Sequence, residues 1–129
     1  MNREIKFRGK RIDNGEWVYG DLLQPTEICD IYEIANCESI DGTRYEVISE
    51  TIGQYTGLHD RNGKEIYEGD IVKIIGSKEI DIGKVIYEYN EFIVDVMNMD
   101  RFYGRVHPLE KFTEVIGNIT DNPELLGGE

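Results

Sequence analysis

The chain has 129 residues, the length of one ordinary domain, and a domain of this size can fold without a disulfide or a metal. Its composition, 40% hydrophobic and 31% charged with only 3 prolines, excludes the collagen, coiled-coil and disordered classes. Lys and Arg number 14 against 26 Asp and Glu, and the resulting net charge of −12 opposes general binding to a phosphate backbone.

The first predicted element is a β-hairpin. Residues 5–12 and 16–23 both show the two-residue alternation of half-buried strands. Asn14-Gly15 lies between them, and Asn-Gly favours the two-residue type I′ turn. With these two as the loop, Gly9 is predicted to lie opposite Gly20, which suggests a bend, a bulge or the close approach of another strand.

The middle of the chain predicts short strands and turns. Residues 28–34 and 44–48 indicate two strands joined through a turn at 41–42. A strand interrupted by two glycines is expected over 51–58, and residues 60–64 form a polar turn.

A second hairpin is predicted in the last half, after a short apolar strand at 70–75. Its strands are 82–89 and 92–97, with Asn90-Glu91 as the connection. This register places six apolar side chains on one face: Val85, Tyr87 and Tyr89 opposite Val96, Val94 and Phe92. Their burial would contribute of order 10 kcal/mol before chain entropy is subtracted, so this hairpin is expected to be core.

The end of the chain predicts one more strand and a helical turn. The strand is 114–119; Asn122 is the expected N-cap, Pro123 the first helical residue and Gly127 the stop, and a further turn is expected at 109–112. The predicted fold is therefore mainly β. We expect a small SH3-like or half-open β-barrel at 64–126, an N-terminal β-hairpin region at 1–58, and one domain over 1–129.

No metal, cofactor or catalytic constellation is expected. Cys29 and Cys37 lack the spacing of a zinc site, and no nucleophile elbow or phosphate-binding glycine loop is present. The carboxylates Glu65, Glu68 and Asp70 are interpreted as strand-end charges, and an enzyme that uses them is the weakest of three functional hypotheses.

Positive charge is concentrated at the start of the chain. The first eleven residues carry five basic side chains against Glu4, a local balance of 5 − 1 = +4. Two interpretations stay open: these cations are neutralised by acidic strands of their own chain, or they form a basic patch that meets a partner or a second subunit.

Three blocks of sequence resemble a known family. They are REIKFR at 3–8, the run from IGQYTGL at 52–58 to NGKEIYEGDIV at 62–72, and EVIGNI at 114–119 with NPELL at 122–126. Together they resemble the YopX family of phage and prophage proteins. The resemblance implies a small β-rich protein, encoded in bacteriophage or prophage DNA, that acts in the bacterial cytoplasm. It implies no reaction and carries over no site residues.

The leading functional hypothesis is a non-enzymatic interaction module that binds a host or phage macromolecule, with a protein as the expected partner. A nucleic-acid-binding accessory protein that uses the basic N-terminal strand is the alternative, although the net charge disfavours it. No membrane span or signal peptide is evident, and homo-oligomerisation stays open. The expected partner-binding residues combine cations with aromatic side chains expected to be exposed: Arg3, Lys6, Arg8, Lys10, Trp17, Tyr55, Tyr67 and Tyr103.

Overall fold

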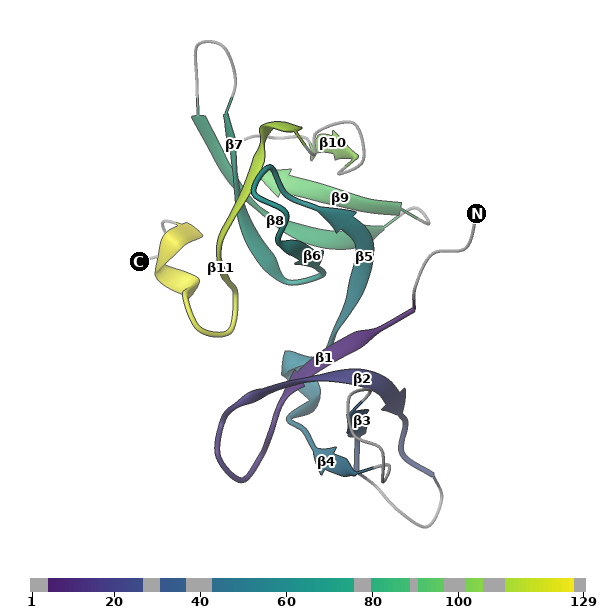
Figure 1. Cartoon of the computed structure of the whole chain (residues 1–129). Helices are drawn as coiled ribbons and strands as arrows, with labels where there is room; N and C mark the ends of the chain where they lie inside the picture. Colours follow the sequence, from purple (N-terminus) through teal and green to yellow (C-terminus); the bar gives the residue numbers. More distant parts are fainter. Residues whose placement is uncertain are drawn as a thin grey trace. The chain divides into compact units, whose positions relative to one another are not determined.

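The computed structural model describes residues 5–26, 31–36, 43–75, 80–88, 91–96, 102–105 and 111–126, with the backbone alone for residues 36 and 102–105. These residues form antiparallel strands and short 3₁₀ turns (Figure 1), so the prediction of a mainly β fold is confirmed. The described strands form open sheets and no closed barrel. No helix in this part of the chain is long and apolar enough to cross a membrane.

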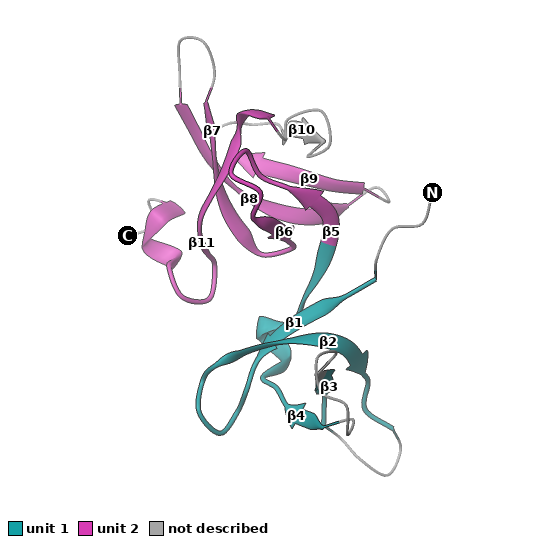
Figure 2. Cartoon of the chain, viewed as in Figure 1, with its two compact units in different colours: residues 1–55 teal, residues 56–129 magenta. Residues whose placement is uncertain are grey.

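The chain divides into two compact units, Met1–Tyr55 and Thr56–Glu129 (Figure 2). The strand β5 (Gly53–His59) begins in the first unit and ends in the second. Whether both units act as one domain, as the sequence analysis expects, stays a prediction.

Unit 1 is an antiparallel sheet with the order β4-β3-β2-β1 followed by the start of β5. Its elements are β1 (Phe7–Lys10), β2 (Trp17–Leu23), β3 (Glu33–Asn36), β4 (Arg44–Glu46) and the 3₁₀ turn η1 (Ser49–Thr51). The predicted strand at 28–34 falls partly on 27–30, outside the described residues; the described strand in this region is β3.

The core of unit 1 is small. It consists of Val18, Ile34 and Val47, with partly buried hydrophobic side chains packed around them. A Cβ at Gly9 would lie 3.1 Å from the Cβ of Val47 and 3.2 Å from Cδ1 of Ile34. The missing side chain at Gly9 therefore lets β1 lie close against this core.

The register predicted for the first hairpin is wrong by two residues. Gly9 lies opposite Val18, and Gly20 lies opposite Phe7. The loop holds four residues, not two, because Arg11 N donates to Glu16 O (2.9 Å). A shift of two residues changes which residues lie opposite each other, but each side chain still points to the predicted face of the hairpin.

Unit 2 holds the rest of β5, its neighbour β6 and a five-stranded antiparallel sheet with the order β10-β9-β8-β7-β11. Its elements are β6 (Glu65–Tyr67), β7 (Asp70–Ile75), β8 (Ile80–Glu88), β9 (Glu91–Val96), β10 (Phe102–Arg105), β11 (Thr113–Asn118) and the 3₁₀ turn η3 (Pro123–Leu126). The helical turn expected at 109–112 lies largely outside the described residues.

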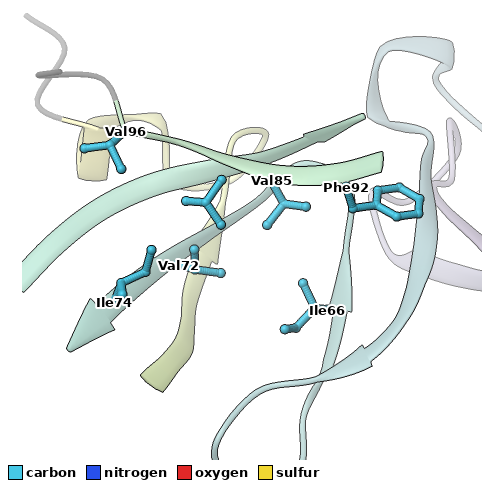
Figure 3. Close-up of a cluster of buried hydrophobic side chains, with 7 residues drawn as sticks. Ile66, Val72, Ile74, Val85, Phe92 and Val96 are labelled. Carbon is cyan, nitrogen blue, oxygen red and sulfur yellow. The ribbon is translucent and has the colours of Figure 1, made fainter. Parts of the chain in front are cut away.

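The core of unit 2 lies on one face of this sheet. Side chains from β7, β8 and β9 point toward one another and toward β6 (Figure 3). All are at most 8% exposed: Ile66, Val72, Ile74, Val85, Phe92, Val94 and Val96. Leu58 and Val115 pack against this cluster. The hairpin β8-β9 is thus core, as predicted.

The register of the second hairpin is also shifted by two residues from the prediction. Val85 lies opposite Val94 and Tyr87 opposite Phe92, with Glu88 opposite Glu91 as the last pair. The inward face is retained, but Tyr87 is an exception because it is 48% exposed. Its ring contacts that of Phe92, with centroids 4.9 Å apart. Tyr89 lies outside the described residues.

A tight turn precedes β7, as the sequence predicts. The buried carboxylate of Asp70 accepts a hydrogen bond from the Tyr67 N–H (2.7 Å). Glu65 accepts one from the Tyr67 hydroxyl (2.9 Å). Both carboxylates therefore fix the chain around Tyr67.

The polar turn after β5 is organised by Asp60, which is 6% exposed. One carboxylate oxygen accepts from the N–H groups of Asn62 (2.8 Å) and Lys64 (2.9 Å). The other accepts from the N–H of Val115 on β11 (2.9 Å). Burial raises the pKa of this carboxyl, but the three backbone donors and the Lys64 charge outweigh it and leave the pKa below its ordinary value.

Replacing Asp60 by asparagine is expected to lower the free energy of unfolding at neutral pH by about 1.5 to 3 kcal/mol. The amide oxygen can still accept from the turn, but the amide NH₂ cannot accept from Val115. Chemical denaturation measures this change, and Asp21→Asn on the exposed side of β2 is the matched control. Equal stabilities for the two variants would contradict this role of Asp60.

The Asp60 contribution is also expected to depend on pH. The pKa of Asp60 is lower in the folded state than in the unfolded state. The stabilising contribution of Asp60 is therefore complete above the unfolded pKa of about 3.9 and is lost as pH falls through the lower folded pKa. The difference in unfolding free energy between wild type and Asp60→Asn should therefore narrow below about pH 4. A difference that stays constant down to about pH 2 would exclude this linkage.

The C-terminal turn forms at the predicted place, but its cap differs. Leu125 N donates to the backbone oxygen of Asn122 (3.0 Å), while the Asn122 side chain accepts from Asn118 N (3.2 Å). The side chain thus reaches back toward β11 and does not cap the turn. Gly127 lies outside the described residues.

Candidate functional site

The candidate site lies at the end of the first hairpin, where a four-residue loop joins β1 to β2. Gly15 N donates to Arg11 O (3.0 Å), and Gly15 has a φ of 75°, a conformation that glycine adopts readily. The side chain of Asn14 accepts from Glu16 N (2.9 Å). This bond engages Asn14 within the longer loop and fixes the loop's path.

The chain after β4 lies beside this loop. Arg11 and Val47 form an antiparallel bridge, Ile12 N donates to Glu46 O (3.0 Å), and Ile48 N donates to Lys10 O (2.9 Å). The start of the loop is therefore held against β4 by backbone hydrogen bonds.

Between the loop and β4 lies a cavity of about 330 Å³, which we call the hairpin hollow. Loop and strand contribute three residues each to its lining: Arg11, Ile12, Asp13, Arg44, Tyr45 and Glu46. Its charged side chains are two arginines and two carboxylates, a formal balance of 2 − 2 = 0. This is more positive than the chain as a whole, whose net charge is −12.

Arg11 is held from two directions. Its Nε donates to Oδ1 of Asp13 (2.9 Å) and its Nη2 to Oδ2 (2.7 Å). The guanidinium carbon lies 4.2 Å from the centre of the Tyr45 ring. The hydrogen bonds from Arg11 lower the pKa of Asp13, and the same bonds raise the pKa of Arg11, so both stay charged. The guanidinium plane is thus fixed in orientation.

Arg44 is held less firmly. Its side chain is 62% exposed, and its contact with Glu33 Oε1 is 3.9 Å, longer than a hydrogen bond. At the rim of the hollow, the side chain of Ile12 is 56% exposed. The hollow therefore combines one fixed arginine, one adaptable arginine and an exposed apolar side chain.

The structure brings together most of the partner-binding residues expected from sequence. Lys6 lies over the Tyr55 ring, 5.2 Å from its centre, and both Arg8 and Lys10 lie over Trp17, at 4.7 and 5.7 Å. We call these five residues the basic aromatic cluster. They gather because β1 has β5 on one side and β2 on the other.

The expectation that the aromatic side chains are exposed is wrong for two of them. Tyr55 is 4% and Tyr67 3% exposed, and Arg8 of the cluster is only 7% exposed. The Tyr67 hydroxyl donates a hydrogen bond to Glu65 and the Tyr67 N–H donates one to Asp70, so both ends of this residue are engaged within unit 2. Arg3 and the Tyr103 side chain lie outside the described parts of the chain.

Sequence reasoning missed the hairpin hollow. Arg11 precedes the loop and Asp13 lies within it, two positions later, and this spacing is the one local signal for their ion pair. The pairing of Arg11 with Tyr45 leaves no local signal because the residues are 34 positions apart in the chain.

Within the described ranges, no three His, Cys, Asp or Glu side chains converge as a metal site requires. Cys29, Cys37 and His107 fall outside those ranges.

Comparisons with known proteins place the chain in a family. A search of curated proteins gave no match. Among solved structures, the chain is similar to the crystal structure of protein EF1440 from Enterococcus faecalis. The sequence identity is 25% and the TM-score 0.61, over 97% of this chain and 99% of that one. The family model described as YopX protein matches residues 6–127, nearly the whole chain. The chain therefore belongs to the YopX protein family.

Proposed function

We propose that this protein is a non-enzymatic interaction module that binds a host or phage macromolecule in the bacterial cytoplasm, with the hairpin hollow at the centre of the binding surface. The observation that carries the proposal is the Arg11 guanidinium, fixed by Asp13 and Tyr45 in a cavity whose rim exposes Ile12. Arginine and tyrosine are enriched among residues that dominate protein interfaces, and a fixed side chain loses little entropy on binding.

The proposal is tested by affinity capture from bacterial lysates, with and without phage infection. Wild type is compared with Ile12→Asp at the hollow and with Ile80→Asp, which changes an isoleucine that is 60% exposed in unit 2. Wild type and the Ile80 variant should recover the same partner, and the Ile12 variant should lose it. Failure to recover a partner from either lysate would overturn the proposal.

A second candidate function is nucleic-acid binding through the basic aromatic cluster. Its support is the partly exposed portion of the cluster, Lys6, Lys10 and Trp17, since cations bind phosphates and aromatic rings stack on bases. The expected result is an affinity for single-stranded DNA that falls steeply with salt and weakens in Lys10→Ala. Undetectable binding at low salt would end this candidate.

A further inference from the structure

Among the described residues, the hydrogen-bonding capacity of Arg11 is only partly used. A guanidinium has five N–H donors in one plane. Asp13 accepts along the side that carries Nε and one hydrogen of Nη2. The opposite end of the guanidinium group, formed by Nη1 and the second hydrogen of Nη2, has no acceptor among the described residues. This end has the spacing that binds both oxygens of a second carboxylate.

Arg44 supplies a second cation to the same hollow. Its guanidinium has no carboxylate within hydrogen-bonding distance in the described part of the chain, since Glu33 lies at 3.9 Å. The side chain is exposed and long, so it can turn toward an anion held by Arg11 without disturbing the core. The two arginines thus differ in role: one is fixed beforehand and the other can close on a ligand.

Charge and size limit the ligand. The formal charge of the hollow lining is zero and the chain carries −12, so a polyanion is repelled over a wide surface, whereas a single carboxylate meets both guanidinium groups at short range. A cavity of about 330 Å³ lies at the small end of ligand sites and admits one side chain. Exposed Ile12 at the rim suits apolar residues beside that acid.

We infer that the hairpin hollow receives the carboxylate of an aspartate or glutamate side chain from a partner protein, bound end-on by Arg11 and covered by Arg44. This inference rests on the proposed function and names the chemistry of the partner at that site. Glu46, which also lines the hollow, opposes the incoming carboxylate and keeps the site weak for an isolated acid.

The test is a titration followed by amide chemical shifts of the whole chain. The probe is the tripeptide Val-Glu-Val with acetylated and amidated ends, and its control is Val-Gln-Val blocked in the same way. The glutamate peptide should shift the amides of the loop and of β4 and bind about tenfold more tightly than the glutamine peptide. Equal affinities, or shifts confined to other elements, would overturn the inference.

Two substitutions sharpen the test. Arg44→Gln should remove most of the tenfold preference, whereas Arg61→Gln, an exposed arginine in unit 2, should leave it unchanged. Glu46→Gln should strengthen binding of the glutamate peptide about twofold, because a like charge is removed. A gain in affinity cannot come from damage to the fold. Weaker binding by the Glu46 variant would contradict the inference.

Inorganic phosphate is the third probe. Phosphate is expected to bind more weakly than the glutamate peptide does. Tighter binding of phosphate in the hollow would overturn the assignment to a carboxylate. These results are separable from the proposed function. A lysate partner recovered equally by wild type and Arg44→Gln would leave the interaction module standing without the carboxylate site, whereas peptide binding without any lysate partner would refute the module alone.

Discussion

Replacing Ile66 by alanine is expected to lower the free energy of unfolding by about 3 kcal/mol, within the range of about 2 to 5 measured for such truncations. Ile66 on β6 is 0% exposed and packs in the cluster with Val72 and Val94. Removing its side chain forfeits apolar burial and leaves a cavity that strands fixed by hydrogen bonds cannot fill. Urea denaturation followed by circular dichroism measures the loss.

The control for this experiment is Ile80→Ala. Ile80 lies on β8 of the same unit but is 60% exposed, so its truncation should change the unfolding free energy by no more than about 0.5 kcal/mol. Similar losses for the two variants would contradict the placement of Ile66 in the core of unit 2.

Replacing Gly83 by alanine is expected to cost about 2 to 3 kcal/mol, because no space exists for the added carbon. A Cβ there would lie 2.6 Å from the backbone oxygen of Asp95 and 2.9 Å from Cγ1 of Val94. Gly83 lies opposite Val96 in the β8-β9 ladder, so relieving the contact displaces hydrogen-bonded backbone.

The comparison for Gly83 is Gly9→Ala in unit 1. There the nearest atoms are the Cβ of Val47 at 3.1 Å and two side-chain methyl carbons at 3.2 Å, all farther away than the backbone oxygen at Gly83, so a smaller loss of about 1 kcal/mol is expected. Thermal and chemical denaturation of both variants gives the ranking. A larger loss for Gly9→Ala would mean that the side chains of Val47 and Ile34 are held more rigidly than the β8-β9 backbone.

The inward faces of the strands could be predicted from sequence, but the strand partners could not. The two-residue spacing of Phe92, Val94 and Val96 assigns the buried face, and a register shift of two residues leaves that face unchanged. The register depends on the loop. In the first hairpin, the side chain of Asn14 bonds Glu16 N within a four-residue loop, a choice that the Asn-Gly pair alone does not reveal.

The candidate site was predictable only where its contacts are local. Trp17 lies on the strand next to the basic residues of β1, so a hairpin is enough to bring them together. The hairpin hollow requires the return of β4 to the loop, and the anchoring of the Asp60 turn requires Val115, 55 positions further along. Such contacts are set by tertiary packing and leave no spacing signal in the sequence.

The order of the strands in unit 2 also has a consequence for synthesis on the ribosome. The hydrogen-bond partners of β1 to β4 all lie within the first 55 residues, so this half can pair its strands as soon as it has emerged. By contrast, β7 lacks one neighbour until β11 (Thr113–Asn118) has been translated. A nascent chain therefore carries an apolar strand with an unprotected edge late into translation, and this interval is when chaperone binding or misassociation should be greatest.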